Sequence, residues 1–196
     1  MPMSKKIVHL TWIIPSMLMV FTTKAKQPNI IYLMLDEWGY FESGHMGSSE
    51  LITPNIDQFA ADGMRFTNAY AGAPVCGPTR CSLLTGLHAG NMSMRVNNGH
   101  SPIRADEPTL ATVLKTKGYA TGGFGKWGIG GRGTTGVPEK HGFDLFFGYY
   151  DQVHAHTFYP SYLIRNSEEV PLPGNSGTSF YEGKTHAQLE IFKGSF

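Results

Sequence analysis

The sequence lacks both an imbalance of charge and a framework of cysteines. Its 196 residues carry 16 Lys and Arg against 15 Asp and Glu, so no basic face is available and a nucleic-acid partner is not expected. The two cysteines, Cys76 and Cys81, are five residues apart across a turn and a first helical turn, a spacing that makes a disulfide awkward. Without a C-x-x-C pair and a neighbouring pair of histidines, they make no zinc site.

A run of apolar residues long enough to span a membrane is also missing from the N-terminus. The apolar segment 7–21 follows Lys5 and Lys6 and is interrupted by Pro15, and it is too short for a membrane-spanning helix. Residues 23–25 approximate a small-x-small cleavage site. We therefore expect a signal peptide over residues 1–25, export to the periplasm or the outside, and no stable membrane insertion after cleavage; an uncleaved anchor is the alternative.

The sequence also lacks a nucleotide-binding loop. Residues 123–128 spell G-x-G-x-x-G, but the fingerprint should follow the first strand and open a helix. The glycines at 130–136 forbid a helix here, and Trp127 stands where a Walker loop needs Ser or Thr after Lys126. Neither a dinucleotide site nor a P-loop is predicted.

Residues 74–86 are the most informative stretch that is present. Prolines and a glycine predict a turn just before a helix, and Gly86 is placed to end that helix. Cys76 is then expected just before the N-terminus of the helix, where the exposed N–H groups favour negative charge. A buried, inert thiol is the alternative interpretation for a single free cysteine.

Local patterns predict an alternation of strands and helices. The apolar run 29–35 is typical of a central parallel strand, and it ends at Asp36 and Glu37, where open α/β sheets place ligands. A helix is expected over 53–62, with Thr53 as the N-cap, and a strand over 64–71.

Two further elements are predicted in the middle of the chain. Residues 109–115 have the pattern of an amphipathic helix that ends before Gly118. Residues 119–125 are expected to form a short strand that delivers Lys126. Further on, His154 and His156 would share one face of an extended segment; on spacing alone they allow a paired-His zinc site, with the third ligand missing.

Three motifs in this order resemble the formylglycine-dependent sulfatase family. Residues 76–86 contain C-x-P-x-R followed by L-L-T-G, the signature in which the cysteine is oxidised to formylglycine. Residues 125–130 match G-K-W-H-x-G except that Gly128 replaces the histidine, and residues 142–148 match G-F-D-x-F-x-G. The adjacent carboxylates at 36–37 match a calcium-binding pair in which Glu37 replaces the second aspartate.

The resemblance implies an alkaline-phosphatase-like α/β/α sandwich with a mostly parallel sheet, incomplete at the C-terminus. Residues 26–173 would be the N-terminal part of the catalytic domain, and residues 174–196 an irregular tail. Sulfatases are usually more than twice this length, and their remaining calcium ligands lie farther along the chain, so the 196 residues alone are expected to be inactive.

The implied function is that of an arylsulfatase-like sulfuric ester hydrolase acting on a carbohydrate or aryl sulfate. The implied partners are the substrate and a formylglycine-generating or sulfatase-maturing enzyme, and the cofactors are Ca²⁺ and formylglycine from Cys76. The resemblance assigns roles to these residues: Asp36, Glu37 and Cys76 bind calcium, Arg80 orients the hydrated aldehyde, Lys126 holds the sulfate, and His156, or alternatively His154, protonates the departing alcohol.

Two other functions stay open from the sequence. One is a phosphate or phosphonate ester hydrolase of the same superfamily, which would share the strand and carboxylate geometry. The other is a truncated fragment without catalytic activity.

Overall fold

The structure is a computed structural model that describes residues 26–97, 102–157 and 159–175. The expected signal peptide at 1–25 and most of the expected tail at 174–196 lie outside those residues. The chain divides into two compact units, Met1–Glu37 and Trp38–Phe196, which are considered separately. The elements, all in the second unit, are η1 (Gly44–Met46), α1 (Pro54–Asp62), α2 (Cys76–Thr85), α3 (Leu110–Lys115), β1 (Gly122–Lys126), η2 (Pro138–His141), β2 (Leu145–Tyr149), α4 (Gln152–Ala155), β3 (Tyr162–Arg165), β4 (Glu168–Pro171) and η3 (Pro173–Asn175).

The three longer helices confirm the sequence predictions, with small shifts at their ends. Thr53 precedes α1, Pro54 is its first residue and Gly63 follows its last. Thr109 caps α3 and exchanges hydrogen bonds with Thr112, an arrangement that satisfies N–H groups left over at a helix start.

Helix α2 begins at Cys76 itself, with Val75 as the N-cap, so Pro78 lies inside the first turn instead of opening the helix. The first turn tolerates proline because its N–H groups have no intrahelical partner. At the other end Gly86 takes a left-handed φ of 71° and donates its N–H to the Ser82 carbonyl over 2.9 Å. Glycine adopts this conformation without strain, as the sequence predicts.

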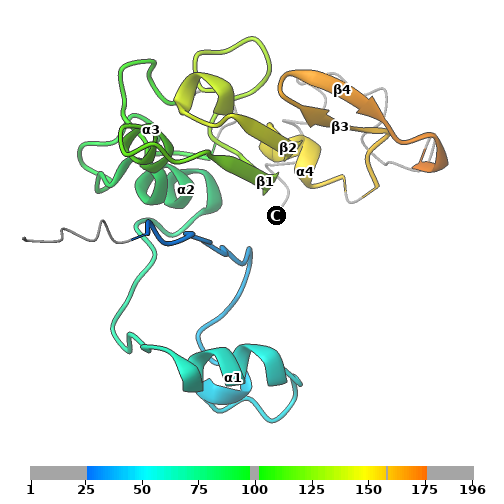
Figure 1. Cartoon of the computed structure of the whole chain (residues 1–196). Helices are drawn as coiled ribbons and strands as arrows, with labels where there is room; N and C mark the ends of the chain where they lie inside the picture. The colour runs from blue at the N-terminus through cyan, green and yellow to red at the C-terminus, as the bar shows by residue number, and fades with distance from the viewer. Residues whose placement is uncertain (1–25, 98–101, 158, 176–196) are drawn as a thin grey trace, which may run out of the picture. The chain divides into compact units, whose positions relative to one another are not determined.

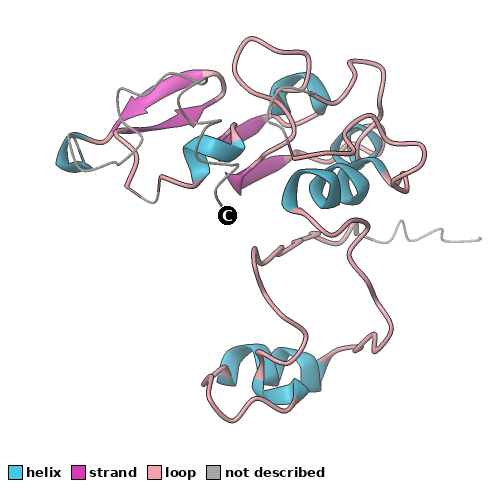
Figure 2. Cartoon of the chain, turned by 180° about the vertical axis from the view of Figure 1, so that it is seen from behind, coloured by secondary structure: helices cyan, strands magenta, loops and turns pink. Residues whose placement is uncertain are grey.

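The described strands form one mixed sheet in the order β1-β2-β3-β4, visible in Figure 1 and, from behind, in Figure 2. β1 and β2 are parallel, whereas β2–β3 and β3–β4 are antiparallel. The parallel pair carries the core: Trp127, just after β1, makes edge-on contacts with Phe143 and with Phe146 of β2. Together with the helices, this sheet confirms the α/β class in a partial form.

Two predicted strands are not formed. Residues 29–35 and 64–71 belong to no strand of the described chain, and the apolar side chains of Ile31 and Leu33 are 84% and 81% exposed. A central parallel strand needs hydrogen-bonded neighbours and helices over both faces. No described segment pairs with either run, so the expected partners are missing from the part of the chain that the structure describes.

Candidate active site

The ends of the two parallel strands bring several predicted residues together. Lys126 is the last residue of β1, and the pairing with β2 continues beyond it, because Gly128 N–H donates to the Tyr150 carbonyl over 3.0 Å. The chain after β2 turns into α4, which carries Gln152 and leads to His156. The carboxyl ends of parallel strands are where α/β sheets place their ligands, so this edge is the candidate site.

The buried indole of Trp127 fixes the end of β1. Trp127 is 4% exposed and its Nε1–H donates to the Gly136 carbonyl over 2.7 Å. Because side chains alternate along an extended chain, an inward Trp127 leaves the preceding Lys126 on the other side. The sequence G-K-W therefore holds a lysine at the strand end through an anchored tryptophan.

Arg80 links α2 to this strand end. This α2 residue is 8% exposed, and its Nη1 donates a hydrogen bond to the backbone carbonyl of Lys126. Cys76 lies one helical turn before Arg80 on the same helix and is partly buried. This hydrogen bond thus joins the helix that carries Cys76 to the segment that carries Lys126.

The two candidate histidines have different surroundings. His156 is exposed, and its Nε2 lies 3.4 Å from Lys126 Nζ. His154 instead packs between aromatic rings, with ring centroids 4.4 Å from Tyr162 and 5.3 Å from Tyr149. Burial lowers the pKa of His154 below its usual value, which disfavours its protonated form, while His156 is the histidine beside the lysine.

The expected extended segment around these histidines is wrong. α4 is helical because the Asp151 side chain caps it, accepting hydrogen bonds from Val153 N–H over 2.6 Å and His154 N–H over 3.3 Å. His154 and His156 therefore do not share one face of a strand, which removes the basis on which spacing alone allowed a paired-His zinc site. Asp151 is therefore the N-cap residue of α4.

Two side-chain amides at this site were missed from the sequence. Asn97 Nδ2 donates to Cys76 Sγ over 3.4 Å, and its Oδ1 accepts from Gly77 N–H over 3.3 Å. Gln152 is 3% exposed and its Nε2 donates to the Gly128 carbonyl over 3.1 Å. No motif marks Asn97, but Gln152 follows the end of a parallel strand, a position that could have drawn attention to it.

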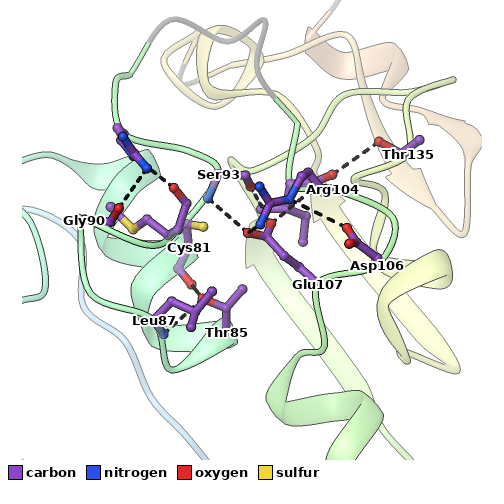
Figure 3. Close-up of polar contacts among 12 residues, drawn as sticks. Cys81, Thr85, Leu87, Gly90, Ser93, Arg104, Asp106, Glu107 and Thr135 are labelled. Carbon is purple, nitrogen blue, oxygen red and sulfur yellow. Dashed lines mark hydrogen bonds and ion pairs between the residues drawn. The ribbon is translucent and has the colours of Figure 1, made fainter.

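The second cysteine is structural. Cys81 is fully buried, and burial is the main cause that raises the pKa of its thiol, with the negative charge of Glu107 adding to it. Figure 3 shows Cys81 in α2 near the buried carboxylate of Glu107, which binds Ser93 and Arg104. A reactive cysteine needs access, so the partly exposed Cys76 is better suited to chemistry than the buried Cys81.

The predicted metal ligands do not all lie in one unit. Asp36 and Glu37 belong to Met1–Glu37 and Cys76 to the second unit, and Glu37 has a left-handed φ of 57°. Among residues 26–97, 102–157 and 159–175, no three His, Cys, Asp or Glu side chains gather as a metal site. Asp36 and Glu37 remain predictions on the chemistry of their oxygen donors, which suits a hard cation.

Comparison with known proteins identifies the family. The sulfatase family profile matches residues 28–186, and the chain therefore belongs to the sulfatase family. The match extends past residue 173, where the part of the chain that resembles the family was expected to end.

Individual relatives agree with this assignment. Human arylsulfatase D is 40% identical over 141 residues, which cover 65% of this chain and 24% of that protein. Bovine arylsulfatase A is 38% identical over 146 residues, covering 70% and 28%. The chain spans about a quarter of the length of these curated relatives.

A solved structure supports the fold assignment. A protein in complex with its substrate D-glucosamine-2-N,6-O-disulfate aligns with a TM-score of 0.64 at 28% identity, over 75% of this chain and 28% of that one. The α/β architecture and the family resemblance read from the motifs are both confirmed. In the described part of the chain, no helix is long and apolar enough to cross a membrane.

Proposed function

We propose that this chain carries the nucleophile-bearing part of a sulfuric ester hydrolase whose nucleophile derives from Cys76. The observation that carries the proposal is the hydrogen bond from Arg80 to the Lys126 carbonyl, which joins the cysteine helix to the lysine at the sheet edge. Arylsulfatases at 38–40% identity support the same activity.

Cys76 suits oxidation to formylglycine because it is partly exposed at the first turn of α2. The oxidation replaces the C–S bond and one C–H bond with a C=O bond whose oxygen comes from water. The sulfur leaves as hydrogen sulfide, and two electrons and two protons pass to an external oxidant at the maturing enzyme. Once hydrated, the aldehyde supplies an oxygen nucleophile for attack on sulfur. Arg80 holds the helix that presents it.

Lys126 and His156 have complementary roles in this proposal. The Lys126 ammonium is a positive charge for the sulfate oxygens, and such preorganised charge stabilises the transition state. The imidazole of His156, 3.4 Å from Lys126 Nζ, protonates the departing alcohol. His156 is preferred to His154, since His154 is packed among aromatic side chains and burial lowers its pKa.

Asp36, Glu37 and residue 76 are proposed to contribute to a calcium site, where the cation would neutralise charge on the sulfate. Calcium takes roughly six to eight oxygen ligands, so these three residues fill only part of the shell. The proposed substrate is a carbohydrate or aryl sulfate ester, by analogy with the sulfated-glucosamine complex. The proposed location is the periplasm or the exterior, after removal of residues 1–25.

The decisive test is the chemical state of residue 76. The 196-residue chain is co-produced with a formylglycine-generating enzyme, and the peptide containing residue 76 is analysed by mass spectrometry. We expect the aldehyde mass at residue 76 and an unmodified thiol at Cys81, which serves as the internal control. A thiol at both positions would contradict the proposal.

The substrate class is tested separately. In the longest form of the protein that the gene encodes, nitrophenyl sulfate should be cleaved faster than nitrophenyl phosphate, and Cys76→Ser should abolish turnover. Preference for phosphate would favour the related phosphate or phosphonate hydrolases. Absence of turnover with either ester, despite an aldehyde at residue 76, would favour a non-catalytic fragment.

A further inference from the structure

Gln152 lies between two glycines of the candidate site. A Cβ atom on Gly128 would lie 2.5 Å from Gln152 Nε2 and 3.2 Å from Arg80 Cδ. A Cβ atom on Gly77, the residue after Cys76, would lie 3.3 Å from the same Nε2 and 2.8 Å from Asn97 Oδ1. The absence of side chains at both positions therefore lets one amide reach the start of α2 and the segment after Lys126.

One atom of this amide is buried without a partner. Gln152 Nε2 donates to the Gly128 carbonyl, but Gln152 Oε1 is buried and accepts no hydrogen bond from the residues that the structure describes. A buried acceptor left without a hydrogen bond destabilises the folded state, and most such groups in native proteins have a partner. This acceptor is therefore open to a hydrogen-bond donor that the described residues do not supply.

The thiol of Cys76 is a poor candidate for that donor. S–H is a weak donor, and the sulfur already accepts a hydrogen bond from Asn97 Nδ2. Oxidation of Cys76 would change this, because hydration of the resulting aldehyde creates two hydroxyl groups. The oxygen of water bonds to the aldehyde carbon and one water proton passes to the carbonyl oxygen.

We propose that Gln152 is a positioning residue for residue 76, and that its buried Oε1 accepts a hydrogen bond from a hydroxyl of the hydrated aldehyde. This inference rests on the proposed formylglycine function. Gln152 thereby favours the hydrated form and fixes the orientation of one hydroxyl. Gly128 and Gly77 provide the space that this amide occupies.

The test measures hydration directly and does not depend on turnover. Chains with converted residue 76 are labelled with an aminooxy probe, which reacts with the free aldehyde and not with its hydrate. Gln152→Met keeps the length of the side chain and removes the acceptor. We expect labelling about fivefold faster than in the parent, the effect of one neutral hydrogen bond. Gln58→Met, at an exposed position of α1, should label at the parent rate.

A second variant protects the test against misfolding at position 152. In Gly128→Ala the new methyl group would lie 2.5 Å from Gln152 Nε2 and would displace the amide, although Gln152 itself is unchanged. This variant should also be labelled faster than the parent. Parent-like labelling in either variant, with its circular dichroism unchanged, would overturn the role of Gln152. Lack of conversion of residue 76 in the parent would instead overturn the formylglycine hypothesis, and this inference with it.

Discussion

The buried carboxylate of Glu107 should be a main stabilising group of the second unit. Its side chain is 3% exposed and accepts hydrogen bonds from Ser93 N–H and Arg104 N–H, each over 3.0 Å, from Ser93 Oγ, and from Arg104 Nη2 over 3.2 Å (Figure 3). These bonds fasten the segment before Asn97 to the segment that leads into α3. Removing Glu107 should therefore loosen the segment that leads to Asn97, whose side chain donates a hydrogen bond to Cys76.

The expected loss can be worked out from these contacts. Glu107→Ala leaves the N–H groups of Ser93 and Arg104 without their acceptor, and each lost hydrogen bond of this kind costs about 1–3 kcal/mol. The exposed Arg104 guanidinium adds little. We expect a loss of about 3 kcal/mol in the free energy of unfolding, or a fall of roughly 6–12 °C in Tm for a chain of this size.

Urea unfolding followed by circular dichroism measures this difference. Glu107→Gln keeps one acceptor oxygen and should lose about half as much. The matched control is Asp106→Ala, because Asp106 is the neighbouring carboxylate, 84% exposed, and pairs with Arg104 over 3.6 Å; it should change stability by less than about 0.5 kcal/mol. Equal losses for Glu107→Ala and Asp106→Ala would refute the reasoning.

Three further predictions follow from the surroundings of single groups. Iodoacetamide should alkylate Cys76 and spare Cys81 in the folded chain, and peptide mapping should find both alkylated in urea, because Cys81 is buried with a raised pKa; alkylation of Cys81 without urea would contradict this. Hydrogen bonding with Lys115, and then with Thr121, lowers the pKa of Asp144 from 3.8 to about 2, so its contribution to stability is present above about pH 3.8 and is lost as the pH falls towards 2. In Asp144→Asn the urea midpoint should change less between these two pH values than in the parent. A pH dependence as steep as the parent's would count against the ion pair. Burial lowers the pKa of His154 below 6.5, so stability should fall as the pH drops below 6.5, and His154→Phe should reduce that fall; an unchanged pH profile would show that His154 is not held neutral.

The predictions from sequence succeed where the signal is local. Thr53 and Gly63 bound α1, Gly86 ends α2 and Gly118 follows α3. Such signals are local: glycine permits a left-handed backbone, as at Gly86, and a capping side chain such as that of Thr109 binds N–H groups at the start of its own helix. The same holds for the C-x-P-x-R motif, whose spacing places Cys76 and Arg80 about one turn apart. Local rules therefore located the three longer helices.

The failures concern pairing and capping. Residues 29–35 have the composition of a buried strand, but a strand exists only with partners, which a local pattern does not reveal. The helix at α4 could have been foreseen, since Asp151 is a strong N-cap residue. The β3–β4 hairpin turns at Asn166 and Ser167, with φ of 45° and 69°, and a two-residue turn of this kind favours asparagine.

The site itself depends on a combination that the separate motifs do not show. β1 and β2 are parallel neighbours, so Lys126 and the residues after Tyr149 emerge at one edge. Arg80 then brings α2 to the same edge through a backbone carbonyl, which requires no particular side chain at its partner. Because Gly128 leaves room where a side chain would meet Gln152, the loss of the motif histidine and the presence of this glutamine are parts of one local arrangement. A change at either position should therefore be judged with the other, and their combined replacement should not be additive.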